Sequence, residues 1–302
     1  MKKLLPFFLV LASFSSFAQD TAAFKKDTSY WKNAVKVGLN LNQASFSDNW
    51  KGGGVNSVSY LAFLNATSDY AKGKASFNNV LDLQFGSVNN KNSGFFKNVD
   101  RIYFDSKLGY KLAKSWDLFA SVNFLTQFYQ GNTIKTVNGK DTTIFISDFM
   151  APGYLTEAIG VEYKPVEWFY VRFGTGAARQ TFVSANNISQ EDTKNYGVDP
   201  GKSWRNEFAF MLQSGINKDL NKSVNLKAVY MGFANWQIPQ AIKDNTNITW
   251  FDYIDHRLNA TLTAKVTKYI STTLTGQLIY DYDQDPNVQF SQSLGFGILV
   301  TF

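Results

Sequence analysis

The C-terminal stretch, residues 291–302 with the sequence SQSLGFGILVTF, constrains the fold of this chain more than any other segment. Every second residue in it is apolar, and the residues between are mostly small or polar, with Leu299 as the exception. The apolar set is Leu294, Phe296, Ile298, Val300 and Phe302. A period of two predicts a β-strand with one apolar face. We interpret this strand as the one that closes a barrel, with Gly295 and Gly297 facing a narrow lumen.

A strand that ends the chain on an aromatic residue resembles the last strand of bacterial outer-membrane barrels. The resemblance implies that Phe302 is an assembly signal, recognised by the barrel assembly machinery. That machinery is then one expected partner, and the lipid of the outer membrane is another.

Residues 1–18 have the features of a secretory signal peptide. Lys2 and Lys3 precede an apolar run over residues 4–11, and small residues surround a cleavage site after Ala18. The run is too short to span a bilayer as a helix, although an N-terminal membrane anchor is the alternative interpretation. We therefore expect a cleaved signal peptide at 1–18, a short periplasmic tail at 19–33 and an outer-membrane barrel at 34–302.

From residue 34 onward, the sequence contains about twelve segments that alternate apolar and polar residues. They cover 34–47, 56–70, 74–87, 99–112, 116–130, 154–163, 169–182, 205–216, 224–233, 253–266, 270–282 and 291–302. Connections after the even segments are short, and most of those after the odd segments are longer, which is typical of short periplasmic turns and long external loops. The sequence predicts an all-β, transmembrane, antiparallel up-and-down barrel of about twelve strands with both termini in the periplasm. An exported β-sandwich is the main alternative, but it has no reason to sort its loops in this way.

Composition narrows the function classes. The chain has no cysteine, which excludes disulfides, thiol catalysis and zinc–thiolate sites. Its formal charge of +6 is too small and too scattered to indicate a nucleic-acid partner. Aromatic residues make up 16% of the chain and fall near the predicted strand ends, as the interfacial girdles of a membrane barrel require.

A family resemblance rests on four stretches. They are residues 41–57 (LNQASFSDNWKGGGVNS), 79–86, 105–111 (DSKLGYK) and 124–131 (FLTQFYQG). Together they resemble an uncharacterised family of Bacteroidota, known as a domain of unknown function and thought to form an outer-membrane barrel. The resemblance covers most of the mature chain, and it implies a location and a fold but no reaction.

The most specific stretch contains the predicted first external loop. Its main residues are Asn49, Trp50, Gly52, Gly53 and Gly54. Glycines permit positive φ angles and close backbone approach. The loop either packs over the mouth of the barrel or contacts a ligand there.

Charged residues of both signs are expected on the lumen face. The basic set is Lys36, Arg101, Lys107, Lys111, Arg172, Lys227, Arg257 and Lys265. The acidic set is Asp82, Asp105, Asp117, Glu162, Glu207, Asp255 and Asp281. A strongly ion-selective pore would show one dominant sign, whereas balanced charges in a narrow barrel are expected to pair and to fill the lumen.

Catalytic chemistry is not indicated. The single histidine, His256, is expected to face lipid near the external end of its strand, and a serine hydrolase needs a serine and an orienting group beside it. Ser293 is expected to face the lumen instead. Asp281, Asp283 and Asp285 have the spacing that opens a calcium loop, but Pro286 and Gln292 replace the required Gly and Glu. We therefore expect no enzyme activity and no catalytic, cofactor-binding or metal-binding residue.

Two functions remain open from the sequence. The first is a narrow channel or transporter for an unidentified small solute or lipid-like ligand. The alternative is a non-conducting structural or accessory barrel that binds other proteins of the cell envelope.

The predicted location can be tested on a gel. Because a closed barrel resists detergent at room temperature, we expect the unboiled protein from the outer-membrane fraction to migrate differently from the boiled protein. Recovery as a soluble periplasmic monomer without detergent would contradict the barrel.

Overall fold

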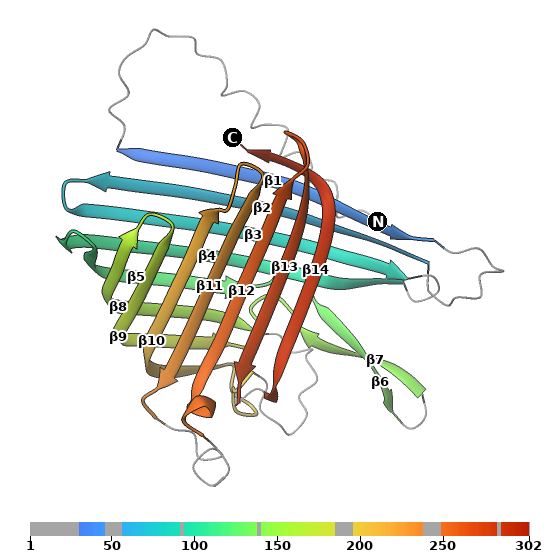
Figure 1. Ribbon diagram of the computed structural model, residues 1–302. Helices are drawn as coiled ribbons and strands as arrows, with labels where there is room; N and C mark the ends of the chain where they lie inside the picture. The colour runs from blue at the N-terminus through green and yellow to red at the C-terminus, as the bar shows by residue number, and fades with distance from the viewer. Residues whose placement is uncertain are drawn as a thin grey trace. The chain divides into compact units, whose positions relative to one another are not determined.

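A computed structural model describes residues 30–45, 56–90, 94–137, 140–184, 196–237, 249–282 and 285–301 of the chain (Figure 1). The chain divides into two compact units, Met1–Tyr30 and Trp31–Phe302, and the second is the barrel. Several predicted features lie outside the described residues. They are the signal peptide 1–18, tail residues 19–29, the loop residues Asn49, Trp50, Gly52, Gly53 and Gly54, and Phe302.

Twelve strands form a closed antiparallel barrel, which confirms the predicted fold class. The strands are β1 (Trp31–Ala44), β2 (Ser57–Lys72), β3 (Ala75–Asn90), β4 (Gly94–Ala113), β5 (Trp116–Thr126), β8 (Gly153–Val166), β9 (Phe169–Phe182), β10 (Trp204–Asp219), β11 (Val224–Asn235), β12 (Ile254–Lys265), β13 (Ile270–Asp281) and β14 (Asp285–Thr301). Around the wall they follow the order β1-β14-β13-β12-β11-β10-β9-β8-β5-β4-β3-β2. Each strand therefore pairs with its neighbours in the chain, except that β5 is followed in the wall by β8 and that β1 pairs with β14 at the seam.

The seam between β1 and β14 closes the barrel as predicted. Leu39 pairs with Ile298, and Leu41 pairs with Phe296. Leu294, Phe296 and Ile298 are exposed on the outer surface, whereas Gly295 is buried. A Cβ atom on Gly297 would lie 2.0 Å from the carbonyl oxygen of Leu39. Glycine at this position therefore permits the two backbones to approach.

Two predicted loops contain strands instead. Residues 131–153, expected to be a loop, contain a hairpin of β6 (Gly131–Val137) and β7 (Lys140–Ser147). Its two arms are rich in Thr, Ile and Val, which favour strands, and Asn138-Gly139 is a dipeptide favoured at hairpin turns. The predicted loop at 88–98 is also mostly strand, because β3 and β4 extend over all but residues 91–93.

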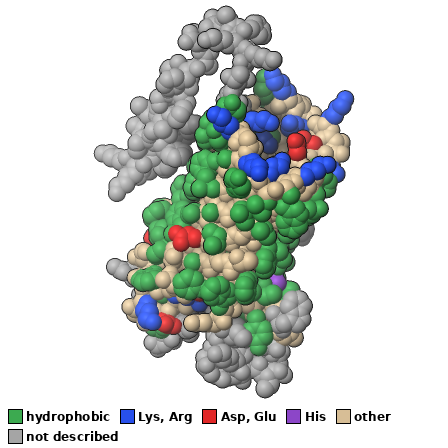
Figure 2. Space-filling view, turned by 90° about the vertical axis from the view of Figure 1, so that its left-hand side faces the viewer, with side chains coloured by type: hydrophobic (Ala, Val, Ile, Leu, Met, Phe, Trp, Pro, Cys, Tyr) green, Lys and Arg blue, Asp and Glu red, His purple; other side chains and the backbone are tan. Residues whose placement is uncertain are grey.

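The two ends of the barrel differ. One end, here called the short-turn end, carries the connections 73–74, 114–115, 167–168, 220–223 and 266–269, and the other is the long-loop end. Aromatic rings lie at the short-turn end, where Trp31 packs on Tyr70 with 5.1 Å between centroids and Trp116 packs on Tyr163 at 4.8 Å. The outer wall in view is covered largely by hydrophobic side chains (Figure 2). Among the described residues, no helix has the length and apolar character needed to cross a membrane.

The outward face of β14 gives a test of lipid contact. Leu294 is exposed and pairs with Leu274 on β13, away from the end of β14. We expect Leu294→Lys to cost about 2–4 kcal/mol of unfolding free energy, as basic residues do near the bilayer midplane. Urea unfolding from lipid vesicles measures this loss. The matched control is Ser293→Lys, on the lumen side of the same strand, and an equal loss in both variants would contradict the assignment of faces.

Candidate functional site

Two cavities that many charged side chains line lie in the part of the lumen that the structure describes. The inner cavity has a volume of about 540 Å³ and reaches the short-turn end, where Lys164, Trp168 and Asn217 line it. The mouth cavity has a volume of about 380 Å³ and lies toward the long-loop end, where Gln127 and Tyr196 line it.

Both cavities are lined by Arg101, Tyr154 and Arg257. The cavities therefore meet at this level of the barrel, and together they extend from the short-turn end toward the long-loop end. We call this level the junction.

One group of buried charges, the Glu162 cluster, lies on the wall of the inner cavity. The Glu162 carboxylate accepts hydrogen bonds from Lys107 Nζ at 2.5 Å and from Arg172 Nε at 2.6 Å. Arg172 Nη1 lies 3.5 Å from Asp105 Oδ2 and donates to Gln213 Oε1 at 3.1 Å. All five side chains are buried. Two cations and two carboxylates thus neutralise one another across strands β4, β8 and β9.

A second group, the Glu207 cluster, lies nearer the long-loop end. Arg179 Nη2 donates to Glu207 Oε2 at 2.9 Å and also to Asp255 on β12. Arg205 forms an ion pair with the same Glu207 oxygen at 3.1 Å. The Arg179 guanidinium also lies 4.4 Å from the ring centroid of Phe233, which is almost fully buried. Each arginine of this cluster therefore has a carboxylate within reach.

Three half-buried cations of the inner cavity differ from both clusters. Among the described residues, Arg101, Lys227 and Arg257 form no ion pair with a carboxylate. Each arginine rests on a tyrosine ring, Arg101 on Tyr103 at 4.7 Å and Arg257 on Tyr154 at 5.1 Å.

Most of the charges that the sequence assigns to the lumen line the inner cavity. They are Lys36, Asp82, Arg101, Asp105, Lys107, Glu162, Arg172, Asp255 and Arg257, together with Lys227 and Asp281. Glu207 lies in the second cluster. Asp117 pairs in register with Lys111 and with Glu162. Lys265 is exposed opposite Ser271 near the short-turn end.

Arg179 is a lumen residue that sequence reasoning missed. Strict alternation from Arg172 places residue 179 on the outer face. In the structure, Ile159 pairs with Gly176 while Gly160 pairs with Gly174, so Thr175 is an extra residue in β9. Such a bulge inverts the alternation beyond it. The Gly174-Thr175-Gly176 sequence is the signal that would have located this bulge.

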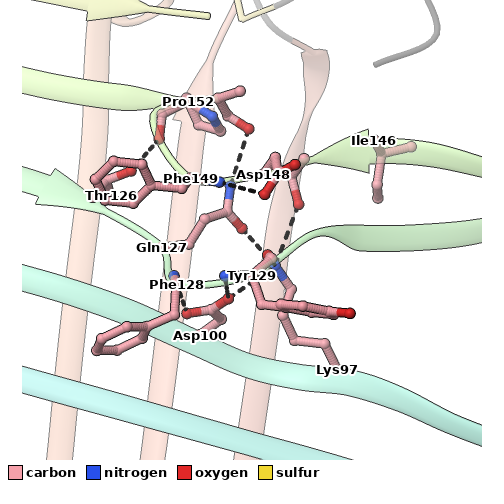
Figure 3. Close-up of polar contacts among 12 residues, drawn as sticks. Lys97, Asp100, Thr126, Gln127, Phe128, Tyr129, Ile146, Asp148, Phe149 and Pro152 are labelled. Atoms are coloured by element: carbon pink, nitrogen blue, oxygen red, sulfur yellow. Dashed lines mark hydrogen bonds and ion pairs between the residues drawn. The ribbon is translucent and has the colours of Figure 1, made fainter. Parts of the chain in front are cut away.

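Residues between β5 and β8 are tied to the wall at the long-loop end (Figure 3). The Asp100 carboxylate accepts the backbone amides of Phe128 at 2.7 Å and Tyr129 at 3.0 Å. Lys97 lies 3.1 Å from Asp100 and donates to Gln127 at 2.7 Å. We call this group the Asp100 network.

The network continues to the end of the same loop. Gln127 Nε2 donates to the Ala151 carbonyl at 3.0 Å, and Thr126 donates to the Pro152 carbonyl at 3.0 Å. A Cβ atom on Gly131 would lie 2.3 Å from Ser147 Oγ and 3.2 Å from Lys97 Nζ, so glycine leaves room for the lysine. Lys97, Asp100, Gln127 and Ser147 all line the mouth cavity. The loop therefore forms part of the wall of the mouth.

Tyr196 adds a contact at this end. Its hydroxyl donates to the Ile146 carbonyl at 2.7 Å, and it also lines the mouth cavity. Burial raises the pKa of Tyr196 above its ordinary value.

His256 is buried, rather than facing lipid as expected, and it is among the residues that line the inner cavity. Its Nδ1 is 2.7 Å from the Tyr230 hydroxyl, and its ring stacks on Phe251 with 4.0 Å between centroids. Phe251 belongs to the 3-10 helix η2 (Trp250–Tyr253), which precedes β12. Ser293 lines the mouth cavity, on the lumen side of the wall. The described residues contain no group of three His, Cys, Asp or Glu side chains arranged to hold a metal ion.

Lysines outnumber carboxylates at the short-turn end. The exposed lysines there are Lys32, Lys72, Lys74, Lys111, Lys114, Lys164, Lys222, Lys265 and Lys268. The carboxylates at this end are Asp69, Asp117, Glu167 and Asp219. A hollow opens at this end of the barrel, and Lys and Arg side chains surround it (Figure 2). The entrance to the inner cavity is therefore positively charged.

Removal of the shared carboxylate tests the Glu162 cluster. Glu162→Gln leaves Lys107 and Arg172 with Asp105 as the nearest carboxylate, and breaking a buried pair in this way costs about 3–5 kcal/mol of stability. Urea unfolding in lipid vesicles measures the loss. Asp199→Asn is the control, because Asp199 pairs with Lys202 on the surface and an exposed pair contributes about 0–1 kcal/mol. Equal losses would contradict a structural role for the cluster.

Comparison with known proteins gives a match to one family. Residues 41–132 match the model of a family described as "Protein of unknown function (DUF3078)". This range includes all four stretches on which the sequence resemblance rests. It covers less of the chain than the resemblance, which was expected to extend over most of the mature chain. No curated protein sequence matches the chain.

Among solved structures, the chain is similar to several outer-membrane barrels. The translocator domain of the autotransporter NalP from Neisseria meningitidis has 10% identity and a TM-score of 0.41, covering 92% of this chain and 90% of that one. An outer-membrane channel from Pseudomonas putida F1 has 11% identity and a TM-score of 0.39, covering 94% and 100%. The toluene transporter TbuX from Ralstonia pickettii has 9% identity and a TM-score of 0.32, covering 89% and 88%.

Proposed function

We propose that this chain is an outer-membrane barrel without enzymatic activity, and that its lumen is a narrow path for a small solute. The location is supported by the closed order of twelve strands and by the outward hydrophobic side chains. The lipid of the outer membrane and the barrel assembly machinery are the partners that such a protein requires.

The observation that carries the proposal is the meeting of the two cavities. A twelve-stranded barrel is wider than the eight-stranded barrels that side chains fill and narrower than porins with an aqueous channel. In this one, the Glu162 cluster occupies part of the lumen, yet the inner and mouth cavities share Arg101, Tyr154 and Arg257. Under this proposal, a small polar solute that enters at the short-turn end passes the junction on its way to the mouth.

The alternative is a non-conducting barrel that binds other envelope proteins. It is favoured by the Asp100 network, which holds the β5–β8 loop against the wall of the mouth, and by the buried ion pairs of the lumen. Under this alternative the lumen charges serve stability alone.

Conductance in planar bilayers separates the two functions. We expect the purified protein to give stable unitary currents, small in comparison with those of wide porins. Asp100→Ala should increase or destabilise these currents, because the amides of Phe128 and Tyr129 lose their acceptor and the loop is released.

Asp199→Ala is the control for this experiment, because Asp199 pairs on the surface with Lys202 and lines neither cavity. It should leave the currents unchanged. Silence of both the wild-type protein and the Asp100→Ala variant would favour the non-conducting alternative.

A further inference from the structure

Arg101 and Arg257 stand on opposite walls of the barrel. From β4 to β12, the path through β5, β8, β9, β10 and β11 takes six steps, and so does the path through β3, β2, β1, β14 and β13. Both side chains line both cavities. Arg257 is repelled by the positive charges of Arg179 and Arg101, and it is attracted by Asp281. The junction is therefore bounded by two guanidinium groups that repel one another.

Neither charge is neutralised by a directly bound carboxylate. Arg101 Nε is buried and has no hydrogen-bond partner, and no ion pair of Arg257 occurs among the described residues. The contrast with the rest of the lumen is clear, since Arg172 and Arg179 each bind a carboxylate at 2.9 Å or less. An unpaired cation in a confined site is unfavourable unless a counter-charge enters.

Other charges near the junction add to the positive field. Lys227 lies close enough to Arg101 and to Lys36 to be repelled by both, and Asp82 is the carboxylate that attracts it. The two Asp82 oxygens already accept hydrogen bonds from Asn65 at 3.1 Å and from Gln84 at 2.9 Å. Asp281, which is buried and lines the inner cavity, attracts Arg257, so two carboxylates face the three cations Arg101, Lys227 and Arg257.

We propose that the Arg101–Arg257 junction is a binding site for a small oxyanion, a carboxylate or a phosphate, that enters the lumen. This proposal deepens the proposed function and rests on it for access from solvent. A guanidinium presents its N–H groups as a planar fork that matches the two oxygens of such an anion. The rings of Tyr103 and Tyr154 lie against the two guanidiniums and support that plane.

The charge of the short-turn end agrees with this ligand class. Lysines surround the entrance to the inner cavity, and a cleft lined by one sign of charge raises the local concentration of the opposite ion. An oxyanion attracted to this entrance reaches the junction through the inner cavity.

Binding can be measured without conductance. The detergent-purified full-length protein is heated with inorganic phosphate, with succinate or with chloride at equal ionic strength. A ligand of the folded state raises the melting temperature as its concentration rises. We expect phosphate or succinate to stabilise the protein beyond chloride. We also expect Arg101→Gln and Arg257→Gln each to weaken the apparent affinity about tenfold, or about 1.4 kcal/mol.

Three further variants make the result specific. Lys202→Gln removes one charge from an exposed ion pair outside both cavities and should leave the affinity unchanged. Arg257→Lys keeps the charge but loses the fork, so its affinity should lie between those of the wild type and Arg257→Gln. Without oxyanion, Arg257→Gln should melt no lower than the wild type because it removes a repulsion, whereas Glu162→Gln should melt lower.

The outcomes separate this site from the proposed function. A shift with phosphate but not succinate, or the reverse, identifies the oxyanion. Shifts equal to those in chloride, or shifts that survive both Arg→Gln changes, overturn the site even where unitary currents are present. Specific binding in a protein without currents retains the site and overturns the path.

Discussion

Pairing of β14 with β1 is the constraint on which the rest of the structure depends. In the hydrocarbon core of a bilayer, an unpaired backbone amide or carbonyl group costs roughly several kcal/mol. A wall of β-strands is therefore tolerated there only when it closes on itself. The seam meets this demand with the register of Leu39 on Ile298, and Gly297 permits the close approach. Successive side chains of a paired strand point to opposite faces of the sheet. Closure of the barrel therefore gives every strand an outer face and a lumen face.

Closure confines the charged residues to a narrow space, and this explains the two clusters. A charged side chain in the lumen that cannot reach bulk water needs a partner of opposite charge. Glu162 and Glu207 each form ion pairs with two cations. The arrangement is local, because the partners come from strands near one another in the wall. Arg101 and Arg257 stand half a circumference apart, and neither forms an ion pair with a carboxylate among the described residues.

The sequence predicted the strands and the seam well because a period of two depends on short-range pattern alone. The prediction failed where one extra residue interrupts the alternation. Because Thr175 is that extra residue in β9, Arg179 faces the lumen and pairs with Glu207 and Asp255. The sequence also predicted a loop where β6 and β7 form a hairpin. The Asp100 network was beyond sequence reasoning because it joins residues from β4, the β5–β8 loop and β7, and no periodicity relates them.

The two ends of the lumen differ in construction, and under the proposed function this difference decides what a solute meets first. The short-turn end has tight connections and exposed lysines, so under that function it selects by charge. The long-loop end has a connecting segment fixed by Asp100 and Lys97, so under that function it selects by shape. The junction lies between them, where the cavities share two arginines. A solute recognised there must satisfy the charge of the first end before it meets the steric limit of the second.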